Sequence, residues 1–316
     1  MNKKVAIIIP CYNITNLPLT RFEKVHDLLR INKLIDVIFV NDGSTDGTKD
    51  FLEKTFSGVE NVLIVHQENK GLSGARLTGL KNVNKNVSHI IFKDADDDLS
   101  SNIDSEFKKL SPDEFGYFKK INYLNGKEVT SWNQKDKQNL ADIYTTKNSA
   151  CLGILPVDLA LKMPFEKILF EDVQFIKWAY ENTLKIKTKK IDMEIFIFYE
   201  INSLSRTSNK EMILDKSLKC HFSWNKLWNK IKDEKLISKR DYKFLVIKCL
   251  TEITTIGNEI HKSDVKKVVV ETMKLKNEKF TKRTSSLKLP FSYRIFYIFL
   301  KLRLYFLCSL ILNHKN

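Results

Sequence analysis

The sequence predicts an α/β fold in which a mostly parallel sheet is flanked by helices. Short runs that are apolar throughout alternate with segments of helical spacing across the first hundred residues. Strands that are apolar on both faces are typical of parallel sheets covered by helices on both sides. Polar and acidic segments follow these runs, at the edge where the carboxyl ends of parallel strands meet.

The predicted elements follow one another in a regular order. The apolar runs are VAIIIP, IDVIFV, NVLIVH and HIIF, at residues 5–10, 35–40, 61–66 and 89–92. Segments of helical spacing lie between them, near 18–33, 46–56 and 71–84. Farther along, Asn125-Gly126 between two β-forming segments predicts a hairpin, and LKIKTKKIDMEIFIFY predicts a further strand.

Composition limits the classes of protein that fit. The 43% of apolar residues is enough for a core, and the five cysteines are odd in number and lack C-x-x-C spacing. That usage argues against a disulfide framework or a zinc cage and favours a reducing compartment. The first apolar run stops at Pro10 without a cleavage site, so no secretion signal is predicted. The net charge of +15 predicts an anionic partner: nucleic acid, acidic lipid or a phosphorylated ligand.

The segment IFKDADDDLS, residues 91–100, places four carboxylates in five positions directly after an apolar run. Such a cluster at the end of a buried strand is costly unless a cation neutralises it. Mg²⁺ and Mn²⁺ prefer oxygen ligands and combine one or two carboxylates with substrate phosphates. We expect Asp94 and Asp96, two apart in a strand-like segment, to face one side of a metal–diphosphate site. The alternative is a solvated acidic turn in which Asp98 caps the next helix.

The loop VNDGSTDGT, residues 40–48, follows the second predicted strand. Gly43 permits a tight turn, and we expect Ser44 or Thr45 to cap the next helix. Such a loop can offer the Asp42 carboxylate to a base or ribose while backbone donors face a phosphate. An ordinary strand–turn–helix joint has the same pattern.

Four collinear motifs together resemble family 2 glycosyltransferases of the GT-A fold. They are VAIIIPCYN, FVNDGSTDGT, ENKGLSGARLTGL and IIFKDADDD, and weaker resemblance continues in LFEDVQF and FYEINSLSR. The resemblance implies a Rossmann-like GT-A domain that transfers a sugar from a UDP-sugar to a hydroxyl of a glycan or lipid-linked glycan. It also implies dependence on Mn²⁺ or Mg²⁺, inversion at the transferred sugar, and a place in bacterial surface polysaccharide synthesis.

The resemblance implies roles for the donor-binding positions that match its motifs. The nucleoside contacts fall on Pro10, Tyr12 and Asn13, with Asp42 at the uracil or ribose. Arg76 approaches the diphosphate, while Leu77 stands where the family usually has Asn. The metal and ribose contacts fall on Asp96 and Asp97, with Asp94 as a supporting or sugar contact.

The resemblance also implies a general base and a closing loop. The base is Asp172, with Glu171 as the alternative, and it takes the proton from the acceptor hydroxyl. Asp172 could instead cap a helix. Arg206 follows a strand and reaches the diphosphate, or else lies in a polar exit loop. The cation and Arg76 would stabilise the negative charge that develops on the leaving diphosphate.

Three parts of the chain are expected: a catalytic GT-A domain at 1–206, a helical region at 207–286 and an amphipathic segment at 287–316. The last segment is rich in Phe, Tyr and Leu but has Lys301 and Arg303 near its middle. A cation at mid-bilayer costs about 2.5–3.5 kcal/mol, so we expect the segment to lie on an anionic membrane surface rather than span it. The alternatives are a buried C-terminal helix or a homo-oligomer contact between copies of this chain. The expected location is cytoplasmic, peripheral on the inner face of the cytoplasmic membrane.

Two other functions remain open from the sequence. A nucleotidyltransferase would use a related sheet and the same acidic site, but with a Gly-rich basic loop after the first strand, where CYNITN stands. A nucleic-acid-binding protein would interleave Lys and Arg with aromatic residues on one face. The acid at the sheet edge argues against that class, so no nucleic-acid partner is expected.

Overall fold

A computed structural model describes residues 3–124, 126–132, 153–165 and 185–199, together with the isolated positions 140, 143, 151, 178, 179 and 182. The chain divides into two compact units, Met1–Ile201 and Asn202–Asn316, and every described residue belongs to the first. The expected helical region and amphipathic segment therefore lie outside the described residues. No helix in the described part is long and apolar enough to cross a membrane.

The first half of the described unit alternates strands with helices, as the sequence predicts. Its elements are β1 (Lys4–Cys11), α1 (Thr20–Ile31), β2 (Ile35–Asp42), α2 (Thr48–Phe56), β3 (Val62–Gln67), α3 (Gly71–Lys81) and β4 (Val87–Phe92). The second half adds β5 (Asp98–Leu99), α4 (Ile103–Phe107), β6 (Glu114–Leu124), β7 (Lys127–Trp132), β8 (Gly153–Pro156), α6 (Val157–Ala160) and β9 (Lys187–Tyr199).

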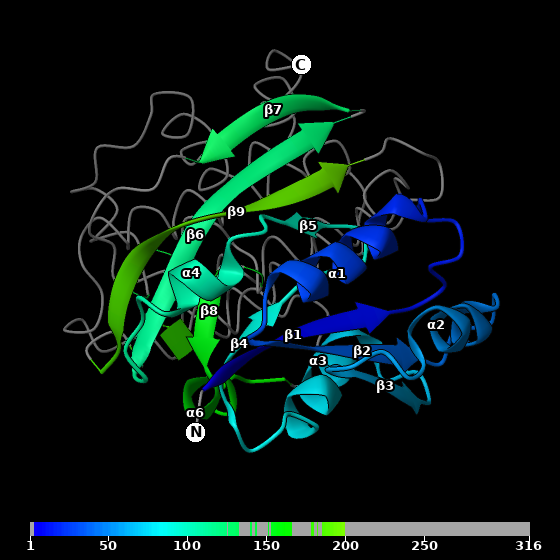
Figure 1. Ribbon diagram of the computed structural model, residues 1–316, viewed down its shortest axis with the longest axis horizontal. Helices are drawn as coiled ribbons and strands as arrows, with labels where there is room; N and C mark the ends of the chain where they lie inside the picture. The colour runs from blue at the N-terminus through cyan, green and yellow to red at the C-terminus, as the bar shows by residue number, and fades with distance from the viewer. Residues whose placement is uncertain are drawn as a thin grey trace, which may run out of the picture. The chain divides into compact units, whose positions relative to one another are not determined.

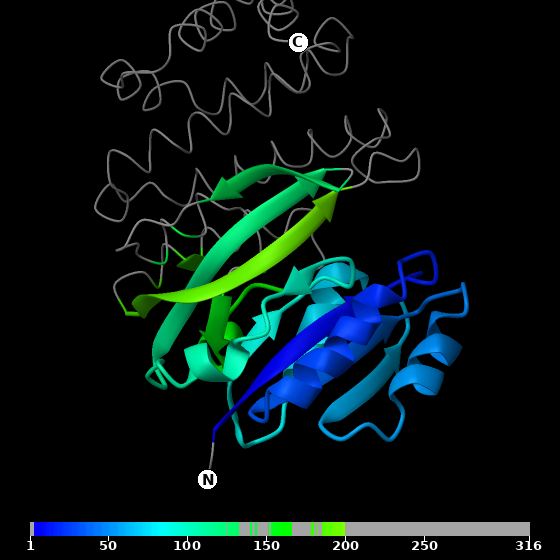
Figure 2. The same cartoon turned by 45° about the horizontal axis from the view of Figure 1, so that its top comes forward.

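The strands form one nine-stranded sheet in the order β3-β2-β1-β4-β8-β6-β9-β5, with β7 paired to β6 (Figure 1). β1 pairs in parallel with β2 and β4, and β2 pairs in parallel with β3, which confirms the predicted parallel sheet. β8 runs antiparallel between β4 and β6, and it joins this half to the long parallel pair β6–β9. Figure 2 shows that pair extending past the blue β1 and α1.

Helices cover both faces of the parallel half because neighbouring residues of a buried strand point to opposite sides. On β2, Phe39 packs against Phe56 of α2, with ring centroids 4.4 Å apart. The next residue, Val40, faces α3, where Gly79 allows close packing. A Cβ at Gly79 would lie 2.3 Å from Cγ2 of Ile8 and 3.3 Å from Cγ2 of Val40. A larger residue there would push α3 off the sheet.

The later strands also agree with the sequence. β6 and β7 are antiparallel, Leu124 lies opposite Lys127, and Gly126 has a φ of 76°. This geometry confirms the hairpin at Asn125-Gly126, because a two-residue loop of this kind favours residues that tolerate positive φ. β9 confirms the strand predicted from the last β-rich segment.

Candidate active site

The candidate site lies at the carboxyl ends of β1, β2 and β4. β1 stands between β2 and β4, and the chain goes to β2 first and reaches β4 on the other side only later. The sheet order therefore changes direction at β1, the point where open α/β sheets usually bind ligands. Pro10 is buried at the end of β1 and the Tyr12 side chain beyond it is 46% exposed. Asp42 ends β2, and the acidic turn follows β4.

The loops after β1 and β2 are joined by hydrogen bonds between neutral groups. The Asn13 N–H donates to Ser44 Oγ over 3.0 Å, and the Thr45 N–H donates to Asn13 Oδ1 over 2.9 Å. The expectation that Ser44 or Thr45 caps α2 is wrong, since the N-cap residue is Gly47. Ser44 Oγ and the Thr45 N–H bond Asn13 instead, so Asn13 ties the loop after β1 to the loop after β2.

Asp46 is the acceptor that organises the start of α2. Its carboxylate accepts hydrogen bonds from the N–H and hydroxyl of both Thr15, at 3.0 and 2.6 Å, and Thr48, at 3.1 and 2.6 Å. Partial burial acts to raise the Asp46 pKa, but these hydrogen bonds to Thr15 and Thr48 outweigh it and lower the pKa from 3.8 to about 2. The carboxylate therefore stays charged and holds the β1 loop against α2.

Asp42 is held in place at the end of β2. Its Oδ1 accepts hydrogen bonds from Gln67 Nε2 at 2.6 Å and from the Lys70 N–H at 2.8 Å. The residue is only 3% exposed, although it stands at the sheet edge where a ligand would approach.

The four carboxylates after β4 form a turn rather than an extended strand. β4 ends at Phe92, and the Asp97 N–H donates to the Asp94 carbonyl oxygen over 3.1 Å. The expectation that strand alternation places Asp94 and Asp96 on one side is therefore wrong, because the strand ends before both. Asp96 is exposed, whereas Asp97 is 3% exposed.

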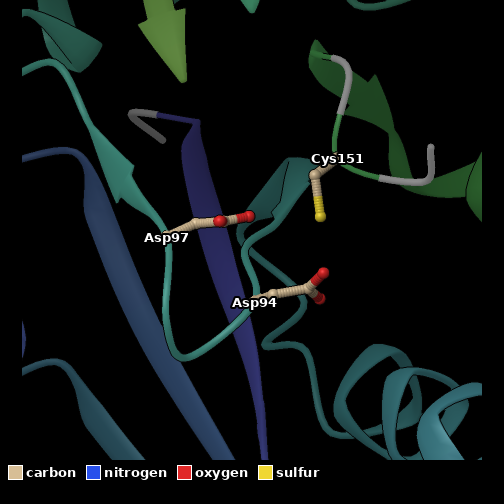
Figure 3. Close-up of side chains that lie close together, drawn as sticks. All are labelled: Asp94, Asp97 and Cys151. Carbon is tan, nitrogen blue, oxygen red and sulfur yellow. The ribbon is translucent and has the colours of Figure 1, made fainter. Parts of the chain in front are cut away.

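The turn brings Asp94 and Asp97 together with a residue that the sequence does not single out. Figure 3 shows the two carboxylates and the Cys151 sulfur facing one another, and their potential ligand atoms all lie within 4.8 Å. Burial raises the pKa of the Cys151 thiol well above its usual range, and the negative charge of Asp94 acts in the same direction. A protonated thiol is a poor ligand, so the group fits a hard cation bound through its carboxylates.

Basic side chains of this chain already balance part of the acidic charge. Asp98 Oδ2 accepts from Arg21 at 2.7 Å and Lys24 at 2.5 Å, both on α1. Asp98 is buried, and α4 begins after Asn102, so the alternative of Asp98 as a solvated helix cap is wrong. The buried Lys93 also lies in the turn, where its Nζ donates to the Asp94 carbonyl oxygen over 3.2 Å.

Arg76 reaches the same turn from α3. Its guanidinium pairs with Asp94 Oδ1 at 2.7 Å and lies 5.9 Å from the centre of the Phe92 ring. The residue is 3% exposed, so its positive charge sits beneath the Asp94 carboxylate. Its predicted approach to a diphosphate stays a prediction.

The electrostatic state of the turn favours an added cation. Burial raises the pKa of Asp97 well above its usual range, and the charges of Asp94 and Asp96 add to this against the opposing Lys93 and Lys120. The Asp96 side chain is exposed, but the protein around it still removes part of its hydration, which raises the pKa of Asp96, and the charge of Asp94 adds to the shift. A divalent cation would stabilise the charged carboxylates, and oxygen donors at this spacing fit Mn²⁺ or Mg²⁺.

Three predicted site residues, Glu171, Asp172 and Arg206, lie outside the described residues, so their roles stay predictions. The ligand roles of Asp96 and Asp97 also stay predictions, although the structure groups Asp97 with Asp94 and leaves Asp96 outside that group. Two residues of the site were not predicted. The sequence does contain a sign of Lys93, because a lysine between an apolar run and an acidic cluster can balance the acidic charge. It contains no sign of Cys151, which is distant in sequence and lies in no motif.

Comparisons with known proteins indicate which family this chain is similar to. Residues 6–149 match the family model described as Glycosyl transferase family 2. Glycosyltransferase GlyA of Streptococcus pneumoniae is 34% identical over 112 residues, which cover 35% of this chain and 15% of that protein. Minor teichoic acid biosynthesis protein GgaA of Bacillus subtilis is 36% identical over 100 residues, which cover 31% of this chain and 22% of that protein. The chain thus spans less than a quarter of the length of either relative.

Solved structures show that the fold is GT-A. The crystal structure of S. aureus TarS 1–349 has a TM-score of 0.61 at 16% identity, and the match covers 99% of this chain and 91% of that one. The mannosyltransferase PcManGT from Pyrobaculum calidifontis has a TM-score of 0.51 at 12% identity, with 98% of this chain and 87% of that one covered.

Proposed function

We propose that this protein, whose residues 6–149 match the model of glycosyltransferase family 2, transfers a sugar from a UDP-sugar to a hydroxyl of a glycan or lipid-linked glycan. The observation that carries the proposal is the grouping of Asp94 and Asp97 after β4, at the point where the strand order reverses. Only β1 separates β4 from β2, which ends at Asp42. S. aureus TarS was crystallised with UDP and with UDP-GlcNAc, and PcManGT with GDP-Man and Mn²⁺. These structures support a nucleotide-sugar donor.

In this proposal the acidic turn holds Mn²⁺ or Mg²⁺ through Asp97, together with Asp96 or Asp94. When bound, the ion supplies positive charge that stabilises the departing diphosphate. Asp42 orients the nucleoside, and the exposed Tyr12, which follows β1, stacks on it. Arg76 holds the Asp94 carboxylate and adds positive charge at the diphosphate side of the site.

The acceptor half of the proposal rests on Asp172 as the general base, with Glu171 as the alternative. The base removes the proton from the acceptor hydroxyl as that oxygen attacks the anomeric carbon from the face opposite the leaving UDP. Attack from that face inverts the configuration of the transferred sugar. Arg206 would close over the diphosphate after donor binding.

The proposed setting is bacterial surface polysaccharide synthesis at the cytoplasmic face of the membrane. One relative is named for minor teichoic acid biosynthesis, which supports a surface glycan as the product. The segment 287–316 would hold the enzyme on anionic lipid near a lipid-linked acceptor. Deleting 289–316 should abolish sedimentation with vesicles that contain anionic lipid, and unchanged sedimentation would contradict the anchor.

The test of the function is a panel of UDP-sugars incubated with the full chain and Mn²⁺ or Mg²⁺, with release of UDP as the readout. We expect one or a few donors to release UDP in a reaction that EDTA stops. Asp172→Asn should bind UDP normally yet lose turnover by about 10²–10⁴-fold, the range for removal of a general base. Glu171→Gln separates the two assignments, since it should keep turnover if Asp172 is the base and lose it if Glu171 is. Turnover near the wild-type value in Asp172→Asn would exclude that residue as the base, and a chain that binds no UDP would contradict the function.

A further inference from the structure

Hydrogen bonds from the described residues reach only one of the two oxygens of the Asp42 carboxylate. Oδ1 accepts both bonds, from Gln67 Nε2 and from the Lys70 N–H. Oδ2 accepts no hydrogen bond from the part of the chain that the structure describes. A side chain that is 97% buried has little freedom to rotate, so the open oxygen keeps one direction at the ligand edge of the sheet.

Gln67 is itself oriented by α3. It ends β3 directly opposite Asp42 in the strand register, and its Oε1 accepts a hydrogen bond from Thr78 Oγ1 over 2.5 Å. Turning the amide over would place Oε1 against the Asp42 carboxylate, where two acceptors would face each other. The carboxylate, which can only accept, therefore fixes the amide with its Nε2 donor toward Asp42, and the Thr78 hydroxyl donates to the remaining Oε1.

We infer that Gln67, held by Thr78, is a positioning residue that aims the open oxygen of Asp42 at the nucleoside of the donor. The inference rests on the proposed function. The imide N–H of uracil and the hydroxyls of ribose are all donors, so an aligned carboxylate oxygen suits either part of the uridine. The network thus links nucleoside recognition to α3, the helix that also carries Arg76.

A merely structural network would predict a different result. If Gln67 and Thr78 only fastened α3 to β3, their loss would lower the stability of the fold without a specific effect on the nucleotide. If Gln67 acts through Asp42, its loss should weaken UDP binding only while Asp42 is present.

The experiment is a double-mutant cycle on the full chain, read by calorimetric titration of UDP at saturating Mn²⁺. Gln67→Leu should weaken UDP binding about tenfold, the effect of losing roughly one hydrogen bond to a charged group. In an Asp42→Ala background the same change should cost less than about twofold. Thr78→Val should weaken binding about two- to fivefold, and it replaces Gln67→Leu if that variant does not fold.

Asn82→Ala is the matched control. Asn82 Nδ2 donates to the Thr78 carbonyl oxygen over 2.9 Å, so this change disturbs the same helix without touching the Gln67 amide. It should leave UDP affinity unchanged. Wild-type affinity in Gln67→Leu, or an equal loss with and without Asp42, would overturn the inference while leaving the proposed function intact. A wild-type chain that binds no UDP would instead refute the proposed function and, with it, the ligand named here.

Discussion

The two sides of the candidate site hold their carboxylates in different ways. On the β1–β2–β3 side, Asp42 and Asp46 accept hydrogen bonds from amides and hydroxyls, and no cation pairs with either in the described part of the chain. On the β4 side, Asp94 and Asp98 pair with Arg76, Arg21 and Lys24. The first side is fixed by directional bonds, and the second by a balance of charge.

This difference indicates that the two sides of the site have different roles. Directional hydrogen bonds fix where an oxygen points, which suits recognition of a nucleoside. A cluster of buried charges fixes position less strictly but responds strongly to any added charge. We therefore expect the acidic turn to change its protonation and geometry when a cation and a diphosphate bind. We expect the Asp42 side to hold the same geometry before and after they bind.

The largest expected effect is on the acidic turn. Asp97→Ala should weaken Mn²⁺-dependent UDP binding by about 100-fold or more, because it removes the buried carboxylate that faces Asp94. Calorimetric titration of UDP with Mn²⁺ and with EDTA measures this. Asp96→Ala should show a similar loss if the motif-based ligand assignment is right, whereas Asp27→Ala, at an exposed ion pair, is a control. Equal Mn²⁺ dependence in Asp97→Ala and wild type would contradict the site.

The next effect is on stability. Asp98→Asn should lower the free energy of unfolding by about 3 kcal/mol, because it leaves Arg21, 14% exposed, beside a neutral group. Urea unfolding measures the loss. Asp113→Asn is the matched control, since Asp113 and Lys187 form an exposed pair at 3.6 Å whose loss should cost less than about 1 kcal/mol. Equal losses in the two variants would show that burial does not distinguish the pairs.

The sequence predicted the parallel half of the fold well because each element there carries a strong local pattern. β1 and β2 are apolar on both faces, and the turn at Asn125-Gly126 follows from two residues alone. The prediction that Ser44 or Thr45 caps α2 was wrong because both residues bond Asn13, which lies more than thirty residues earlier in the sequence. Local propensity does not contain that contact.

The candidate site was predicted in position but not in detail. The motif placed acid after β4, yet only the turn geometry brings Asp97 to Asp94 and Cys151. Gln67 and Lys93 were missed because their importance comes from which side chains they face. Contacts among distant residues, unlike periodicity, leave no regular trace along a single sequence.

A smaller effect is expected on the β1–β2–β3 side of the site. Asn13 has a φ of 51°, which Asn tolerates better than Ala, and its side chain accepts from Thr45. Asn13→Ala should lower the free energy of unfolding by about 1–2 kcal/mol, and Asn13→Gly by about 1 kcal/mol less. Urea unfolding of both variants measures the difference. If Gly were no better than Ala, backbone strain at this position would not matter.

The smallest effect is a pH dependence at Asp46. Because its pKa is lower in the folded state, the ionised carboxylate stabilises the fold above the ordinary pKa, and that contribution is lost as the pH falls from 3.8 to about 2. Asp46→Asn should therefore be less stable than wild type at neutral pH, and the two should converge across that interval. Unfolding measured from pH 5 downward tests this, and a constant difference would contradict it.

The most direct test of the account is a crystal structure of the full chain with UDP and Mn²⁺. We predict anomalous scattering from the metal at the Asp97 carboxylate, with the diphosphate beside it and the uridine within hydrogen-bonding distance of Asp42. An acidic turn without metal, together with UDP bound elsewhere or not at all, would contradict it.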